Sequence, residues 1–224
     1  QLPFPQCEIL AFGIWTLVPS LVLTSDGDVD SAKISAAPIL TITGESNYCK
    51  KIKPFTEDHN PSFKPLLQHE AMVFWNKGVG IQLSHYNLLV NANGIQHAID
   101  LFEDQTYHIN IPPNSMPWVI LQTMLPLYTG APLTSDNPDM RLGINEGDFE
   151  IRFAWNKLED TSPPSLYVCN ENTAFIAMNK MPIHLTAMDD DTSPQTITGH
   201  SVMMGYLEDA LNEIMFTGNG LKIK

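Results

Sequence analysis

The feature that most constrains the fold is a set of short segments in which apolar and polar residues alternate. The clearest is residues 149–155, where Phe149, Ile151, Phe153 and Trp155 share one side. A period of two is typical of a half-buried β-strand. The same pattern predicts strands at residues 79–84, 95–101 and 106–111. Continuous apolar runs predict strands covered on both faces at residues 38–43, 118–125, 166–169 and 174–178.

Turn-forming clusters separate these segments, and the chain contains 17 prolines. Closely spaced strands with such breaks favour an antiparallel β-sandwich of the jelly-roll type over an alternation of strands and helices. One short helix is expected near the C-terminus, where residues 206–216 place Leu207, Leu211 and Ile214 on one stripe. The chain shows no repeat or long linker, so we expect residues 1–224 to form a single domain.

The charge composition narrows the choice of partners. Charged residues make up 17% of the chain, against about 25% in ordinary globular proteins, which favours a surface partly buried against copies of itself or sister subunits. The net charge of −13 argues against binding nucleic acid. The longest apolar stretch, residues 9–23, is too short to span a membrane and contains a proline. The first residue is Gln1 rather than Met, which suggests a processed or excised piece; cleavage from a precursor would give such an end, and so would trimming of a longer chain.

The loop with Asp26, Asp28 and Asp30 is the candidate metal site. Carboxylates at every second position begin the pattern of a calcium loop, but that pattern also needs a carboxylate at its twelfth position, which here is Ala37. An ordinary acidic turn is therefore favoured, and calcium is the ligand to expect if the loop binds a metal. No other cofactor is expected, and the three cysteines form no metal-binding pair.

Ser201 is the strongest candidate for a catalytic residue. The sequence Gly199-His200-Ser201 follows an apolar run and precedes a helical pattern, as in the nucleophile turn of α/β-hydrolases. In that family the catalytic histidine follows the serine, and no histidine follows Ser201 here. We therefore expect no catalytic residue and no enzymatic activity, with a serine hydrolase as an alternative.

Large aromatic residues adjoin several predicted strands. Phe74, Trp75, Trp118 and Trp155 are expected to fill the core or an interface with neighbouring subunits. An exposed row of tryptophans would instead bind sugar rings.

Three segments together resemble the coat proteins of picorna-like RNA viruses. Residues 74–83 are similar to a coat strand with phenylalanine and glycine followed by alternating apolar residues. Residues 107–113 are similar to a later strand that runs into proline, and residues 147–151 to a final Gly-Asp-Phe strand. The resemblance implies an eight-stranded jelly roll that tiles a shell and has no catalytic residues.

The leading hypothesis is therefore a structural subunit of an assembly, located in a virion as a coat or spike protein. Its partners would be copies of itself or sister coat subunits, with a host receptor or glycan outside. The alternative is an extracellular carbohydrate-binding module that uses calcium through Asp26, Asp28 and Asp30.

Overall fold

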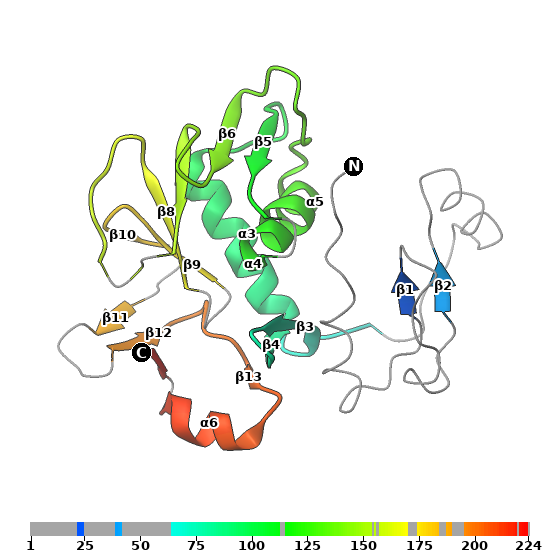
Figure 1. Cartoon of the computed structure of the whole chain (residues 1–224), viewed down its shortest axis with the longest axis vertical. Coiled ribbons are helices and arrows are strands. Elements are labelled where there is room, and N and C mark those ends of the chain that lie inside the picture. The colour runs from blue at the N-terminus through cyan, green and yellow to red at the C-terminus, as the bar shows by residue number, and fades with distance from the viewer. Residues whose placement is uncertain are drawn as a thin grey trace. The chain divides into compact units, whose positions relative to one another are not determined.

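The computed structural model describes residues 64–223 with short gaps, and two strands nearer the N-terminus (Figure 1). The gaps are residues 113–114, 154, 156, 170–173, 184–186, 190–194 and 219. The chain divides into two compact units, residues 1–65 and 66–224. In the first unit, β1 (Val22–Thr24) and β2 (Ile39–Thr41) pair in parallel. The expectation of one domain stays a prediction, because little of the first unit is described.

A mixed six-stranded sheet forms the centre of the second unit. Strands β5 to β8 run parallel to one another, and β8, β9 and β10 pair antiparallel. In spatial order the strands are β10 (Met181–Pro182), β9 (Ala174–Met178), β8 (Ser165–Cys169), β7 (Phe149–Arg152), β6 (Met140–Gly143) and β5 (Tyr107–Asn110). The predicted antiparallel β-sandwich is therefore wrong, although β5, β7, β8 and β9 lie where strands were predicted.

Helices pack against one face of this sheet. They are α3 (His85–Ile99), α4 (Met116–Val119), the π-helix η1 (Ile120–Met124) and α5 (Leu125–Thr129). Helix α3 contacts η1, α5 and β9, and Figure 1 shows its length crossing the second unit. The strands predicted at 95–101 and 118–125 are therefore wrong.

Helix α3 was missed because its interior contains residues that are typical of turns. Asn91 is buried, and its side chain donates to the Asn87 carbonyl at 3.2 Å and accepts from the Phe175 backbone N–H at 2.9 Å. The second bond joins the helix to β9. A residue that sequence patterns place in a turn is here a hydrogen-bonded polar group inside the core.

Pro126 leaves one carbonyl of the π-helix without a backbone donor. In a π-turn each carbonyl accepts from the N–H five residues ahead, and the Leu125 N–H accordingly donates to Ile120 O. The next carbonyl, that of Leu121, would need the N–H of Pro126, which proline lacks. The hydroxyl of buried Tyr107 donates to Leu121 O at 2.6 Å instead. A side chain from β5 thus satisfies the carbonyl that the proline leaves open.

Two smaller sheets complete the second unit. Strands β3 (Glu70–Asn76) and β4 (Val79–Ser84) form a hairpin, to which β13 (Gly205–Tyr206) adds. The other sheet has the order β11 (Ala187–Asp189), β12 (Gln195–Thr198), β15 (Gly220–Ile223) and β14 (Phe216–Thr217). Helix α6 (Asp209–Met215) confirms the helix predicted within residues 206–216.

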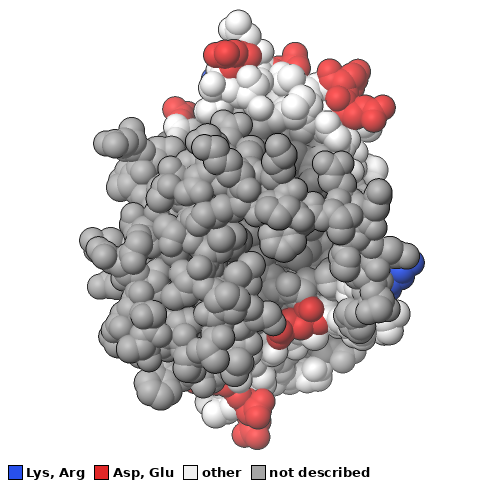
Figure 2. Space-filling model, turned by 90° about the vertical axis from the view of Figure 1, so that its right-hand side faces the viewer, with Lys and Arg blue, Asp and Glu red and all other residues white. Residues whose placement is uncertain are grey.

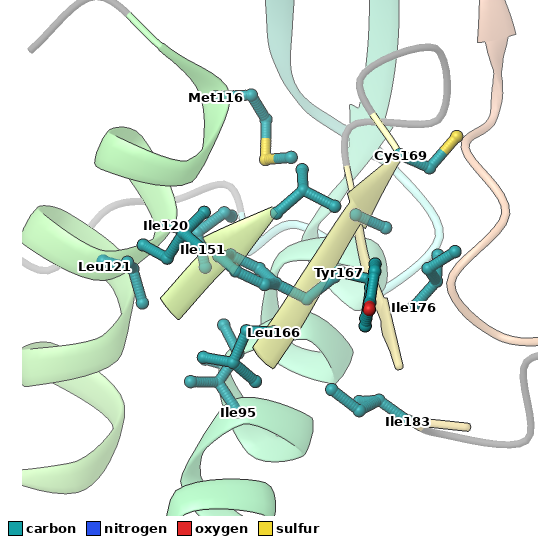
Figure 3. Packing of buried hydrophobic residues seen from close by; sticks show 14 of the residues in the cluster. Ile95, Met116, Ile120, Leu121, Ile151, Leu166, Tyr167, Cys169, Ile176 and Ile183 are labelled. Carbon is teal, nitrogen blue, oxygen red and sulfur yellow. The ribbon is translucent and has the colours of Figure 1, made fainter. Parts of the chain in front are cut away.

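The two faces of the central sheet differ in composition. Ile151 is paired with Leu166, and Leu142 is paired with Phe149, which lies two residues before Ile151 and so on the same face. Leu142, Ile151 and Leu166 are at most 1% exposed. Figure 3 shows Ile151 and Leu166 among the isoleucines and leucines of the helices, including Ile95, Ile120 and Leu121. The side chains that alternate with them point to the opposite face.

The described surface is acidic, and Figure 2 shows more Asp and Glu than Lys and Arg on the face that it presents. None of the helices in the described part of the chain has the length and apolar character to cross a membrane.

Candidate functional site

A cavity of about 400 Å³ lies where α3 begins. Its walls come from three separate parts of the second unit, namely the segment before β3, the junction between β4 and α3, and the segment before β13. The lining residues are Leu67, Gln68, Ser84, Tyr86, Asn87, Val202 and Met204.

The start of α3 is fixed by its own side chains. Ser84 is the N-cap, and its hydroxyl accepts from the Asn87 N–H at 3.0 Å. The Asn87 side-chain oxygen in turn accepts from the Ser84 N–H, which completes a capping box. The N–H groups of His85 and Tyr86 donate to the carbonyls of His69 and Leu67. Because chain carbonyls and Ser84 already occupy these donors, this helix N-terminus does not offer an anion site.

Residues 199–206 are tied to the same place. The Asn87 amide donates to Val202 O at 2.9 Å, and the Met204 N–H donates to Gln82 O at 3.0 Å. The Tyr86 hydroxyl and His200 Nδ1 are hydrogen-bonded at 2.6 Å, and the two rings pack edge to face with their centroids 5.7 Å apart. This contact holds His200, 114 positions along the chain, against Tyr86 of the cavity lining.

The lining determines what the cavity can bind. Leu67, Val202 and Met204 give it an apolar wall. Ser84 and Asn87 are hydrogen-bonded to each other, so the Gln68 amide and the Tyr86 hydroxyl are the polar lining groups left to bond a ligand. The cavity therefore suits a molecule with an apolar body and a hydrogen-bonding group.

The residue predicted as a nucleophile is not part of this surface. Ser201 lies between His200 and Val202 in the chain but is 2% exposed. A buried hydroxyl does not reach a substrate, so the serine-hydrolase alternative is wrong.

The other predicted residues lie apart from the cavity. Trp155 is buried in the core, whereas Phe74, Trp75 and Trp118 are half-buried. Their interface role stays a prediction.

The loop with Asp26, Asp28 and Asp30 lies outside the described residues, so calcium binding also stays a prediction. Among the residues that are described, no three His, Cys, Asp or Glu side chains gather as a metal site would require.

Sequence reasoning missed Tyr86 and Asn87. The available signal was the S-x-x-N spacing of Ser84 and Asn87, which is a helix-capping pattern directly after the predicted strand 79–84. No local pattern indicates that Tyr86 meets His200.

Comparison with solved structures identifies the fold. No family model matches the chain, and no curated protein matches it in sequence. Apo MatB from Rhodopseudomonas palustris is 12% identical, with a TM-score of 0.75 over 96% of this chain and 57% of MatB. VinN in complex with L-aspartate is 12% identical, with a TM-score of 0.72 over 96% of this chain and 70% of VinN. O-succinylbenzoate coenzyme A synthetase (MenE) from Bacillus subtilis in complex with AMP is 11% identical, with a TM-score of 0.62 over 91% of this chain and 55% of MenE.

The chain shares its fold with the matched parts of MatB, VinN and MenE. This chain spans a little more than half the length of MatB and MenE. The resemblance to viral coat proteins is therefore wrong, and so are the virion location, the structural role and the absence of enzymatic activity that followed from it. Those expectations rested on alternating strands, which an α/β fold also contains. The alternative of a carbohydrate-binding module is also wrong, because it depended on the β-sandwich fold.

Proposed function

We propose that this protein takes part in the activation of a carboxylic acid by adenylation. In this reaction a carboxylate oxygen attacks the α-phosphorus of ATP. The bond from that phosphorus to the oxygen of pyrophosphate breaks, and pyrophosphate leaves with the electron pair. The products are an acyl adenylate and pyrophosphate.

The observation that carries this proposal is the likeness of fold to MatB, VinN and MenE. MenE has been solved with AMP, a MatB chimera with ATP, and VinN with L-aspartate. Adenine nucleotides and a carboxylic acid are thus the ligands found on this fold.

Within this proposal, the cavity beside α3 receives the carbon part of the acid. Its apolar wall of Leu67, Val202 and Met204 would cover that part. His200, held by Tyr86, would lie at the mouth and bond a polar group of the same ligand.

The test is acid-dependent exchange of radiolabelled pyrophosphate into ATP, measured on the full chain with a panel of aliphatic and aryl acids. We expect exchange that depends on one class of acid, together with binding of AMP by calorimetry. The proposal would be refuted if the chain bound no AMP and catalysed no exchange with any of the acids at millimolar concentrations.

A pair of histidine variants tests the role of the cavity. His200→Ala should weaken binding of the acid by about tenfold, the equivalent of one hydrogen bond at about 1.4 kcal/mol. His97→Ala is the matched control, because His97 is also an exposed histidine but, unlike His200, is not hydrogen-bonded to Tyr86 of the cavity lining. If the two substitutions had equal effects on binding of the acid, the acid would not bind in this cavity.

A further inference from the structure

A second cavity, of about 230 Å³, lies where the parallel strands β5 and β6 end. Its lining residues are His108, Asn110, Arg141, Leu142, Glu146 and Gly147. The carboxyl ends of parallel strands are where open α/β sheets bind their ligands. The volume is below the roughly 300 Å³ at which pockets for drug-sized molecules begin, so the ligand to expect is small.

The strand register brings two basic side chains together. His108 of β5 pairs with Arg141 of β6 in a parallel register, so the two side chains leave the same face of the sheet. Tyr107 and Leu142 point to the other face, which the helices cover. His108 and Arg141 therefore lie side by side on the opposite face, where Arg141 is exposed.

The loop that closes the cavity is tightly built. Its residues 144–148 join β6 to β7, and the Asp148 carboxylate accepts from the Arg141 N–H at 2.8 Å. Gly147 has φ +99°, and a Cβ there would lie 2.7 Å from the Arg141 carbonyl oxygen. At Gly143 a Cβ would lie 3.0 Å from Cγ of Glu146. The absence of side chains at these two glycines lets the loop fold close over the strand ends.

The charges around the cavity have opposite signs. The Glu146 carboxylate accepts a hydrogen bond from the Asn110 amide, which holds it at the cavity. Among the described residues, no carboxylate lies within ion-pair distance of the Arg141 guanidinium. A simple anion at Arg141 would be repelled by Glu146, and a simple cation at Glu146 would be repelled by Arg141. A small zwitterion places each of its charges beside the opposite one.

We propose that this cavity binds a small α-amino acid. The carboxylate of the ligand lies against Arg141 and His108, its ammonium group against Glu146, and a short side chain fits over Gly143. A bidentate guanidinium–carboxylate pair supplies direction as well as attraction. The site is separate from the cavity beside α3, and binding here does not depend on adenylation.

Calorimetry and backbone amide shifts in ¹H–¹⁵N spectra test this on the full chain, without nucleotide. The probes are L-alanine and L-serine, with propionate and propylamine as analogues that carry one of the two charges. We expect the amino acids to bind at least about tenfold more tightly than either analogue, since each analogue loses one charge-assisted contact. The shifts should centre on the amides of Gly143 and Gly147.

Charge-neutral variants assign the contacts. Arg141→Gln and Glu146→Gln should each weaken L-alanine binding about tenfold or more. Arg141→Gln should also abolish propionate binding, and Glu146→Gln should abolish propylamine binding. Lys180→Gln is the matched control, because Lys180 is an exposed cation that pairs with Asp160 and does not line the cavity. Thermal melts verify folding, which is expected because Arg141 and Glu146 are both exposed.

Two results would overturn the proposal. One is the absence of shifts with either amino acid up to tens of millimolar, and the other is propionate binding as tightly as L-alanine with no effect of Glu146→Gln. Neither result bears on adenylation, because pyrophosphate exchange is measured separately.

Discussion

The two faces of the central sheet are held in different ways. On one face Leu142, Ile151 and Leu166 are buried beneath helices, so the energy there comes from burial of apolar area. On the other face, at the β5–β6 end, Arg141 is exposed and its neighbours make polar contacts. Burial is sensitive to the loss of a few atoms, whereas an exposed polar face tolerates substitution. The first face therefore holds the fold together, and the β5–β6 end of the second face is available for ligands.

The largest effect is expected from Leu166→Ala on the covered face. Leu166 is fully buried against Ile151 of the neighbouring strand, so truncation leaves a cavity that the core cannot fill. The free energy of unfolding should fall by about 2–5 kcal/mol. Arg141→Ala, on the open face of the same sheet, should change it by less than about 0.5 kcal/mol. Denaturant unfolding of both variants measures the contrast, and similar losses would contradict the distinction between the faces.

The next effect concerns the polar contact inside the covered face. Tyr107→Phe removes the hydroxyl that satisfies Leu121 O, which should cost about 1–3 kcal/mol of unfolding free energy. Pro126→Ala provides an N–H at the position that a π-turn needs. The cost of Tyr107→Phe should therefore be smaller in the Pro126→Ala background. A double-mutant cycle by denaturant unfolding measures this coupling, and additive effects would show that Pro126 does not create the open carbonyl.

Alkaline pH provides a second test of the same tyrosine. Burial raises the pKa of the Tyr107 hydroxyl well above its ordinary value. Below about pH 10 the tyrosine is neutral in both the folded and the unfolded states. Above that pH it ionises in the unfolded chain first, so its contribution to stability is lost as pH rises. The difference in unfolding free energy between the wild type and Tyr107→Phe should therefore shrink above about pH 10, and a constant difference would contradict the burial of this hydroxyl.

The same contrast between faces explains what sequence patterns could predict. Strands β4, β5, β7, β8 and β9 were predicted because alternation and short apolar runs are local signals. Helix α3 was hidden by Asn91, whose turn-forming character is offset by a bond to Phe175 far along the chain. The run at 118–125 is mostly apolar, as a buried strand can be, and as a helix it packs against α3. Parallel pairing and both cavities arise from contacts between distant segments, which no local pattern contains.

A smaller effect is expected from the backbone of the open face. Gly147→Ala places a Cβ against the Arg141 carbonyl oxygen at φ +99°, so it should cost about 1–3 kcal/mol of unfolding free energy. Gly78 has φ +83° in the β3–β4 turn, and a Cβ there meets no atom within 4 Å. Gly78→Ala should therefore cost only about 1 kcal/mol, from the dihedral alone. Thermal melts of the two variants separate crowding from dihedral strain, and equal losses would show that the loop can move away from β6.

The smallest effect is expected at the amino ends of β5 and β6. The Asp139 carboxylate accepts from the N–H and hydroxyl of Thr106 at 2.7 and 2.8 Å, and these bonds lower its pKa. A carboxylate with a lowered folded pKa stabilises the protein above the ordinary aspartate pKa of about 4. That contribution is lost as pH falls through the lower value. Asp139→Asn should therefore destabilise slightly at pH 7 and lose its effect near pH 2, as chemical denaturation at the two pH values would show. A deficit that persists at pH 2 would mean that hydrogen-bond geometry, and not charge, holds this end of the sheet together.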